Sequence, residues 1–378
     1  MTDVAASHGA GSDVFRRTAK KAIRLLSLIC IAAILVGLTL TAFGVWSTIL
    51  GLPPGLETEM SCLALTAAMG LGIPLGAGQR ILLGLGKQTL STLILGIGGI
   101  LSLANVSIVH AAGQASFALY GIAFASGPLV AQSVVAFVAW RLIRQYPRDS
   151  CQKPTTENIH IRRVALPMAV IAISLPLAYQ SDRVVLSHFS STEELAIYSV
   201  VAVLYSPLLS IVNVGGQTLW PMFIRTTEIR KRRAFHRQSM FLFAILGFLL
   251  ALGLTLFGPF VASFMKSGVA SMNISESTYI VFSLLLFMFA VHTTNGMLLM
   301  DASGRRMQAI GSFALLSIKI PLSVLLATKI GANGVVLASI ISAMLCLVIP
   351  AVLAVRRRLR PPPCISAHSP EPSLDFRV

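Results

Sequence analysis

The sequence predicts an all-α integral membrane protein, a polytopic helical bundle that crosses the bilayer about ten times. Of its 378 residues 55% are hydrophobic and only 12% are charged, whereas a soluble domain carries about 25% charged residues. The mean hydropathy is +0.80. A helix needs roughly 20 mostly apolar residues to cross the hydrocarbon core, and ten stretches qualify: 25–50, 60–80, 89–111, 116–140, 164–182, 194–219, 239–265, 277–300, 308–328 and 334–355. This composition excludes a soluble enzyme, a secreted disulfide module and a disordered chain.

The first four spans form one group and the last six form another. The span at 25–50 follows a basic segment, but its apolar run is longer than the core of a signal peptide, so we expect it to be retained. The longest polar interruption of the chain comes after the fourth span. The predicted organisation is a cytoplasmic N-terminal segment, a first transmembrane lobe of four helices, a cytoplasmic linker, a second lobe of six helices and a cytoplasmic tail, at 1–21, 22–148, 149–163, 164–358 and 359–378.

The basic residues predict that both termini are cytoplasmic. With that orientation, alternation through ten spans places every Lys and Arg on the cytoplasmic side except Arg183, Lys266, Lys319 and Lys329, as the positive-inside rule requires. Cytoplasmic anchoring and contact with membrane lipid headgroups therefore explain the net charge of +16, and we expect no nucleic-acid partner. The five cysteines are odd in number and form no CxxC pair, which fits neither a disulfide framework nor a zinc site.

Few polar side chains lie inside the spans, so their spacing is informative. On the sixth span, Ser206, Ser210, Asn213 and Gln217 are spaced as one helical stripe, and Tyr205 lies near it. Such a stripe either lines a water-filled cavity or makes hydrogen bonds between packed helices.

Lys319 lies near the middle of the ninth span, where a lysine costs roughly 2.5–3.5 kcal/mol on insertion scales. The sequence offers no carboxylate at a comparable depth, since Asp182 is expected at the outer end of the fifth span. We therefore expect an unpaired, fixed cation that binds an anionic substrate. The alternative is a lysine that extends to the interface or is neutral in a packed site.

The eighth span carries His292 and Asn295 at i and i+3, and a lone histidine is more often structural than a ligand. The chain contains no P-loop, GxSxG or HExxH motif, and its seven histidines show no metal-ligand spacing. We therefore expect no enzymatic activity and no cofactor or metal.

Several segments of the second lobe are informative in their order and spacing: Ala165–Pro167, Ser181–Ser187, Glu194–Tyr198, Leu219–Pro221, Asp301–Arg306, Gly331–Gly334 and Ala338–Ser342. Together they resemble the Wzx-type polysaccharide (O-antigen) flippases of the multidrug/oligosaccharidyl-lipid/polysaccharide (MOP) exporter superfamily. The first lobe differs from that family, which commonly has six spans there, as though the first two helices were lacking.

This resemblance implies a two-lobed, MATE-like bundle with a shortened first lobe that works by alternating access in the cell (plasma or inner) membrane. The implied substrate is a polyprenyl-diphosphate-linked oligosaccharide used for surface polysaccharide biosynthesis, and polysaccharide polymerase and chain-length proteins are the implied partners. Arg183 and Lys319 would contact the diphosphate, and the stripe with Tyr205 would line the sugar path. The candidate cavity also includes Asp182, His292 and Asn295.

Two other functions stay open. A MATE-like antiporter of small cationic molecules has the same fold, although an unpaired Lys319 argues against it because it would repel a cation. A truncated, non-transporting scaffold of a polysaccharide assembly complex fits the short first lobe.

Overall fold

The computed structural model describes the backbone of residues 12–51, 54–113, 116–145, 161–226, 228–265 and 273–360. All regular structure in these ranges is helical, without a strand, which confirms the all-α class. The chain divides into two compact units, Met1–Ile159 and His160–Val378. Most of the linker predicted at 149–163, most of the tail predicted at 359–378 and the first eleven residues of the predicted N-terminal segment lie outside the described residues.

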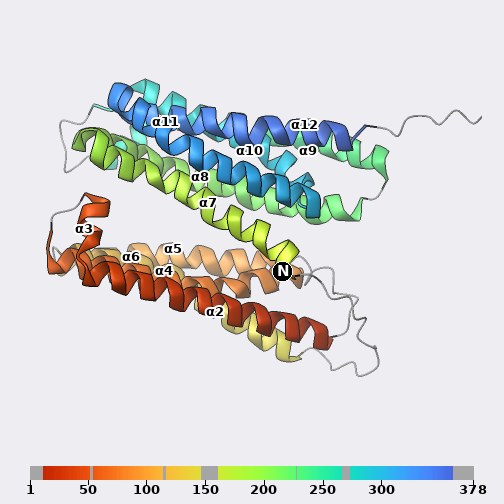
Figure 1. The fold of residues 1–378 in the computed structure, drawn as a ribbon, viewed down its shortest axis with the longest axis horizontal. Coiled ribbons are helices and arrows are strands. Elements are labelled where there is room, and N and C mark those ends of the chain that lie inside the picture. The colour runs from red at the N-terminus through yellow and green to blue at the C-terminus, as the bar shows by residue number, and fades with distance from the viewer. Residues whose placement is uncertain are drawn as a thin grey trace, which may run out of the picture. The chain divides into compact units, whose positions relative to one another are not determined.

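The described part of unit 1 contains four long helices, which Figure 1 shows in red to yellow. They are α2 (Ser12–Ala42), α4 (Leu56–Gly84), α5 (Gln88–Ala111) and α6 (Phe117–Gln145). Glycines let α4 and α5 approach α6 closely. A Cβ at Gly78 would lie 2.5 Å from the Cα of Ala136, and a Cβ at Gly127 would lie 2.2 Å from the carbonyl oxygen of Gly98. Because both obstacles are backbone atoms, only glycine fits, as is common where membrane helices pack.

The first predicted span is wrong at its end. It was expected to run over 25–50, but α2 ends at Ala42, and Gly44 takes a left-handed conformation with φ of 63°. Glycine adopts this conformation without steric cost and so ends the helix. The next residues form the separate short helix α3 (Val45–Leu50).

Unit 2 contains the helices that Figure 1 shows in green to blue. Side-chain oxygens of Ser191, Ser275 and Asp301 accept hydrogen bonds from backbone N–H groups at the starts of α8, α10 and α11, which satisfies donors that a helix start leaves free. The elements are α7 (Ile161–Phe189), α8 (Thr192–Arg225), α9 (Ile229–Met265), α10 (Glu276–Leu298), α11 (Ala302–Ala343), the π-helical turn η2 (Met344–Val348) and α12 (Ile349–Arg358).

Within the described ranges, nine helices are long and apolar enough to cross a membrane, so the chain is a multi-pass membrane protein. The last of them spans Ser303–Arg358, 56 residues, and would be about 84 Å long if straight. It is not straight, because Ile330 and Gly331 have non-helical backbone angles.

The chain reverses at these two residues. A Cβ built on Gly311 would lie 2.5 Å from the carbonyl oxygen of Cys346, and one on Gly334 would lie 2.3 Å from that of Leu326. Both contacts join residues on opposite sides of Gly331, so the segment is a hairpin with two arms. The spans predicted at 308–328 and 334–355 correspond to these arms, and counting both gives the ten crossing segments that the sequence predicts.

Candidate functional site

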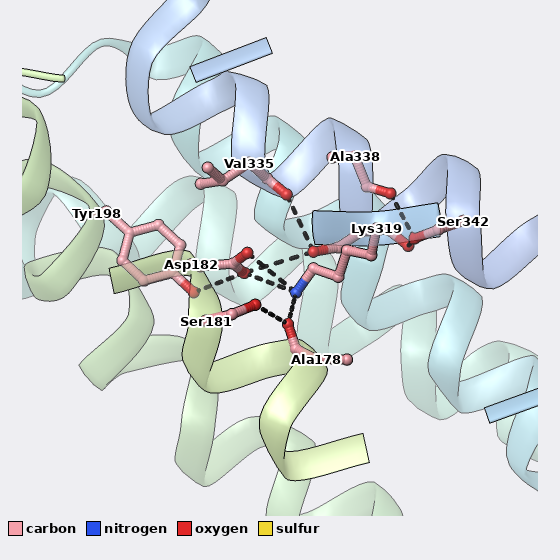
Figure 2. A network of polar contacts seen from close by, with 9 residues as sticks. Ala178, Ser181, Asp182, Tyr198, Lys319, Val335, Ala338 and Ser342 are labelled. Atoms are coloured by element: carbon pink, nitrogen blue, oxygen red, sulfur yellow. Dashed lines mark hydrogen bonds and ion pairs between the residues drawn. The ribbon is translucent and has the colours of Figure 1, made fainter. Parts of the chain in front are cut away.

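Unit 2 buries one lysine against one aspartate. Lys319 is fully buried and Asp182 is 2% exposed. The Nζ of Lys319 lies 3.0 Å from Oδ1 and 3.0 Å from Oδ2 of Asp182, and it also donates to the carbonyl oxygen of Ala178. Figure 2 shows the ammonium between these groups. A buried charge is strongly unfavourable unless it is paired, so the two side chains neutralise each other.

The prediction of an unpaired Lys319 is therefore wrong. The fifth span was expected to end at residue 182, which placed Asp182 at the membrane surface. Helix α7 instead continues to Phe189, so Asp182 lies roughly two turns, about 10 Å, inside its end. At that depth its carboxylate faces the ammonium of Lys319.

Other helices complete the network around the pair. The hydroxyl of Tyr198 on α8 donates to Oδ2 of Asp182 over 3.1 Å, and the hydroxyl of Ser339, on the second arm of α11, lies 3.5 Å from the same oxygen. The ring of Tyr179 lies with its centroid 4.6 Å from the Nζ of Lys319, in the range of a cation–π contact. The network therefore links α7, α8 and both arms of the hairpin.

The polar stripe on α8 lies outside this network. Ser206, Ser210 and Asn213 are exposed and Gln217 is half-buried. The two serine hydroxyls donate to carbonyl oxygens of their own helix, those of Ala202 and Ser206. Among the described residues, none of the four side chains makes a hydrogen bond to another helix, so the stripe does not serve to hold unit 2 together.

Tyr205 is placed apart from the stripe that it was expected to accompany. It is 9% exposed, and its ring packs edge-on against Phe282 at 5.4 Å between centroids. It is a core residue of unit 2. Arg183 directly follows Asp182 but is exposed, so these two neighbours occupy different environments.

His292 and Asn295 are not hydrogen-bonded to each other. Asn295 is 1% exposed, and its Oδ1 lies 3.0 Å from the Nε2 of His236 on α9. His292 is half-buried, and its Nδ1 has no hydrogen-bond partner in the described part of the chain. Across the described ranges, no group of three or more His, Cys, Asp or Glu residues could hold a metal ion.

Sequence reasoning missed Tyr179, Tyr198, Ser339 and His236. Tyr198 and Ser339 each stood in a segment that carried the family resemblance, and that was their one signal. The partnership of His236 with Asn295 joins residues 59 positions apart, which no spacing rule detects.

Comparisons with known proteins locate the fold. No protein-family model matches the sequence, and no curated protein matches it. Solved structures do match. The MATE transporter VcmN from Vibrio cholerae, in its bent form, is 18% identical with a TM-score of 0.62, over 94% of this chain and 84% of VcmN. A multidrug resistance MATE family transporter in the inward-facing conformation is 16% identical with a TM-score of 0.63, over 94% and 86%.

A third match is a MOP superfamily transporter from Pyrococcus furiosus, described as having a binding pocket of reverse polarity that suggests a different function. It is 16% identical with a TM-score of 0.64, over 94% of this chain and 81% of that protein. The chain therefore has the fold of the MATE transporters of the MOP superfamily.

Proposed function

We propose that the protein is a membrane transporter that moves a polyprenyl-diphosphate-linked oligosaccharide across the bilayer by alternating access. The observation that carries the proposal is the exposed, uncharged stripe on α8. From Ser206 to Gln217 it extends about 16 Å along the helix, roughly half of the hydrocarbon thickness. Hydroxyl and amide groups at this depth are costly against lipid, and they can donate to and accept from sugar hydroxyls.

A cation for the diphosphate is also available. Arg183 is exposed on α7, and a guanidinium binds phosphate oxygens in a bidentate manner. Lys319 does not fill this role in the described conformation, because its ammonium group is already paired with the carboxylate of Asp182. The proposal thus assigns the sugar to the stripe and the diphosphate to Arg183.

A second candidate function is the export of small molecules by a MATE-like antiport. The pairing of Lys319 with Asp182 favours it, because it removes the uncompensated cation that would repel a cationic cargo. Both candidates use the same fold and differ in their cargo.

Reconstitution separates them. We would measure, in proteoliposomes, the transfer of a fluorescently labelled undecaprenyl-diphosphate-linked disaccharide between leaflets and, in parallel, the proton-gradient-driven transport of ethidium. We expect lipid transfer well above that of protein-free vesicles and no ethidium transport. Ethidium transport alone would establish the antiporter, and inactivity in both assays would favour a non-transporting scaffold.

The stripe is tested by Ser210→Leu against Ser317→Leu. Both serines are exposed on unit 2 helices, and each hydroxyl donates to the carbonyl four residues earlier, at 2.9 Å for Ser210 and 3.0 Å for Ser317. The local cost of the two substitutions is therefore matched. We expect Ser210→Leu to reduce lipid transfer at least tenfold and Ser317→Leu to leave it unchanged; equal rates would remove the stripe from the substrate path.

A further inference from the structure

Helix α9 has one side in the core of unit 2 and the opposite side exposed. The buried side includes His236, Phe243 and Leu254, which are 8%, 4% and 3% exposed. Residues three or four positions apart share one side of an α-helix, and on the exposed side this spacing joins two kinds of residue. The side begins with arginines and continues with apolar side chains.

The basic part of this side is not neutralised. Arg230, Arg233 and Arg237 are all exposed and are spaced at i, i+3 and i+7. Helix α9 contains no Asp or Glu, and in the described part of the chain none of the three arginines forms an ion pair. The nearby carboxylate of Glu228 contacts Lys231 instead, at 2.8 Å. Three positive charges therefore lie together without a counter-charge.

A surface hollow lies where the basic part meets the apolar part. It has a volume of about 430 Å³ and is lined by Ala234, Arg237, Gln238 and Phe241. Ala234 ends at its Cβ and so leaves space beside the longer side chains around it. The lining combines a cation, an amide and an aromatic ring, which suits a ligand that is anionic at one end and apolar at the other.

The apolar part has the length of one leaflet. Phe241, Ile245, Phe248 and Leu252 are 69%, 42%, 59% and 42% exposed, and they follow one another down the same side of α9. From Phe241 to Leu252 the helix rises about 16 Å, roughly half of the hydrocarbon thickness. An acyl chain that belongs to a headgroup at the arginine end covers this distance.

We propose that the exposed side of α9, from Arg230 to Leu252, binds one anionic phospholipid. Its phosphate contacts the three arginines, its headgroup fills the hollow, and an acyl chain lies along the apolar residues. Guanidinium groups bind phosphate oxygens in a bidentate manner, and basic clusters at the cytoplasmic ends of membrane helices attract anionic lipid. The positive-inside rule assigns the arginine end to the cytoplasmic leaflet.

The occupant is a lipid of the surrounding membrane rather than the cargo. A polyprenyl chain is longer than one leaflet is thick, whereas an ordinary acyl chain matches the apolar part of α9. The cargo site proposed above lies on α8 and α7, so the lipid site stands whichever molecule the protein transports.

Native mass spectrometry of the purified, delipidated full-length protein tests the proposal. Dioleoylphosphatidylglycerol and dioleoylphosphatidylcholine have the same acyl chains and differ in net charge, so titrating each one isolates the headgroup. We expect one phosphatidylglycerol to bind at least tenfold more tightly than phosphatidylcholine. Equal affinities would overturn the proposal. Undecaprenyl diphosphate is the competitor, and its displacement of phosphatidylglycerol at equal concentration would assign the site to the cargo instead.

The first set of variants tests whether the charges act locally. The triple variant Arg230→Gln, Arg233→Gln and Arg237→Gln should reduce phosphatidylglycerol affinity at least tenfold and leave that for phosphatidylcholine unchanged. The matched control is a second triple glutamine variant, which also removes three exposed arginines from unit 2 and should bind like the wild type. Its positions are Arg356, Arg357 and Arg360. Equal losses in the two triple variants would reduce the effect to the general charge of the protein and reject the site.

The second variant tests the hollow without changing any charge. Ala234→Trp fills part of it and should weaken phosphatidylglycerol binding several-fold, whereas Ala172→Trp, at an exposed alanine of α7, should have no effect. All the substituted residues are exposed, so we expect each variant to elute as the same single peak as the wild type. Wild-type affinity in Ala234→Trp would remove the hollow from the site and contradict the proposal.

Discussion

Each unit of the molecule buries a carboxylate, and the two are satisfied in different ways. In unit 1, Glu59 at the start of α4 is 7% exposed, and its oxygens accept hydrogen bonds from the backbone N–H groups of Trp46 (3.3 Å) and Ser47 (3.0 Å). In unit 2, Asp182 is 2% exposed and faces the ammonium of Lys319. The partners of Glu59 are partial charges on a nearby backbone, and the partner of Asp182 is a full charge 137 residues away.

The difference determines what each carboxylate can do. Backbone amides at a helix start are fixed by the fold and cannot be withdrawn without unfolding α3. A lysine side chain has rotatable bonds and can exchange its partner. Glu59 therefore acts as a structural anchor for α3, whereas the Asp182–Lys319 pair holds together two helices that are far apart in the sequence, α7 and α11.

The largest effect is expected from Lys319→Met, which removes the charge and keeps much of the side-chain volume. Breaking a buried ion pair on one side costs about 3–5 kcal/mol, so the unfolding temperature should fall by roughly 10 °C and membrane abundance should decrease. Fluorescence-detected size-exclusion chromatography with a heating step measures both.

The double variant Lys319→Met with Asp182→Leu is the decisive comparison. Replacing both charges by apolar groups is often neutral, so most of the lost stability should return. A double variant as unstable as Lys319→Met would mean that packing, and not the uncompensated carboxylate, causes the loss.

A smaller effect is expected from Glu59→Gln. Glutamine keeps one acceptor oxygen but places an amide N–H₂ against the second backbone donor, which costs about 1–2 kcal/mol. The loss should be local, so hydrogen exchange of the peptide over α3 should accelerate while the peptides of unit 2 stay unchanged. Glu57→Gln is the control, since Glu57 is exposed and, among the described residues, its carboxylate accepts a hydrogen bond only from the hydroxyl of Ser116 at 2.6 Å.

Tyr198→Phe should be milder again. It deletes one hydrogen bond to Asp182 (3.1 Å) while Lys319 stays in place, so we expect a loss of about 1 kcal/mol in unfolding free energy. Tyr205→Phe is closely matched, because both rings pack against Phe282, at 5.5 Å and 5.4 Å. The Tyr205 hydroxyl makes no hydrogen bond to a described residue, so this control should change little. Equal losses would mean that the hydroxyl of Tyr198 does not support the carboxylate.

The sequence predicted the crossing segments and the α8 stripe because each is a pattern within one helix, a long apolar run for a segment and helical spacing of polar residues for the stripe. It failed to pair Lys319 with Asp182 for two reasons. The polar run after residue 180 imitates a helix end, and the contact between α7 and α11 is set by packing that no local pattern encodes. The role of Glu59 was equally hidden, since its partners are backbone N–H groups. Every residue except proline supplies such a group, so the sequence does not mark which ones Glu59 binds.

The smallest effect is expected at Asp301, which caps α11 and contacts Arg358 at 2.5 Å in the turn region outside the spans. Partial burial opposes ionisation of Asp301, but hydrogen bonds from Arg358 and Ser303 outweigh it and lower the pKa of the carboxyl below its ordinary value.

A lowered folded-state pKa of Asp301 stabilises the protein above the unfolded pKa of about 4, and this contribution is lost as the pH falls through the folded value. Because the two side chains are 31% and 49% exposed, solvent screening limits the gain to about 0.5 kcal/mol. Asp301→Asn keeps a capping oxygen but not the charge, so its unfolding temperature should lie slightly below that of the wild type at pH 6 and converge with it near pH 3. Glu228→Gln, which removes the surface pair with Lys231, should show less difference at either pH, and a gap for Asp301→Asn that persists at pH 3 would assign its effect to the cap alone.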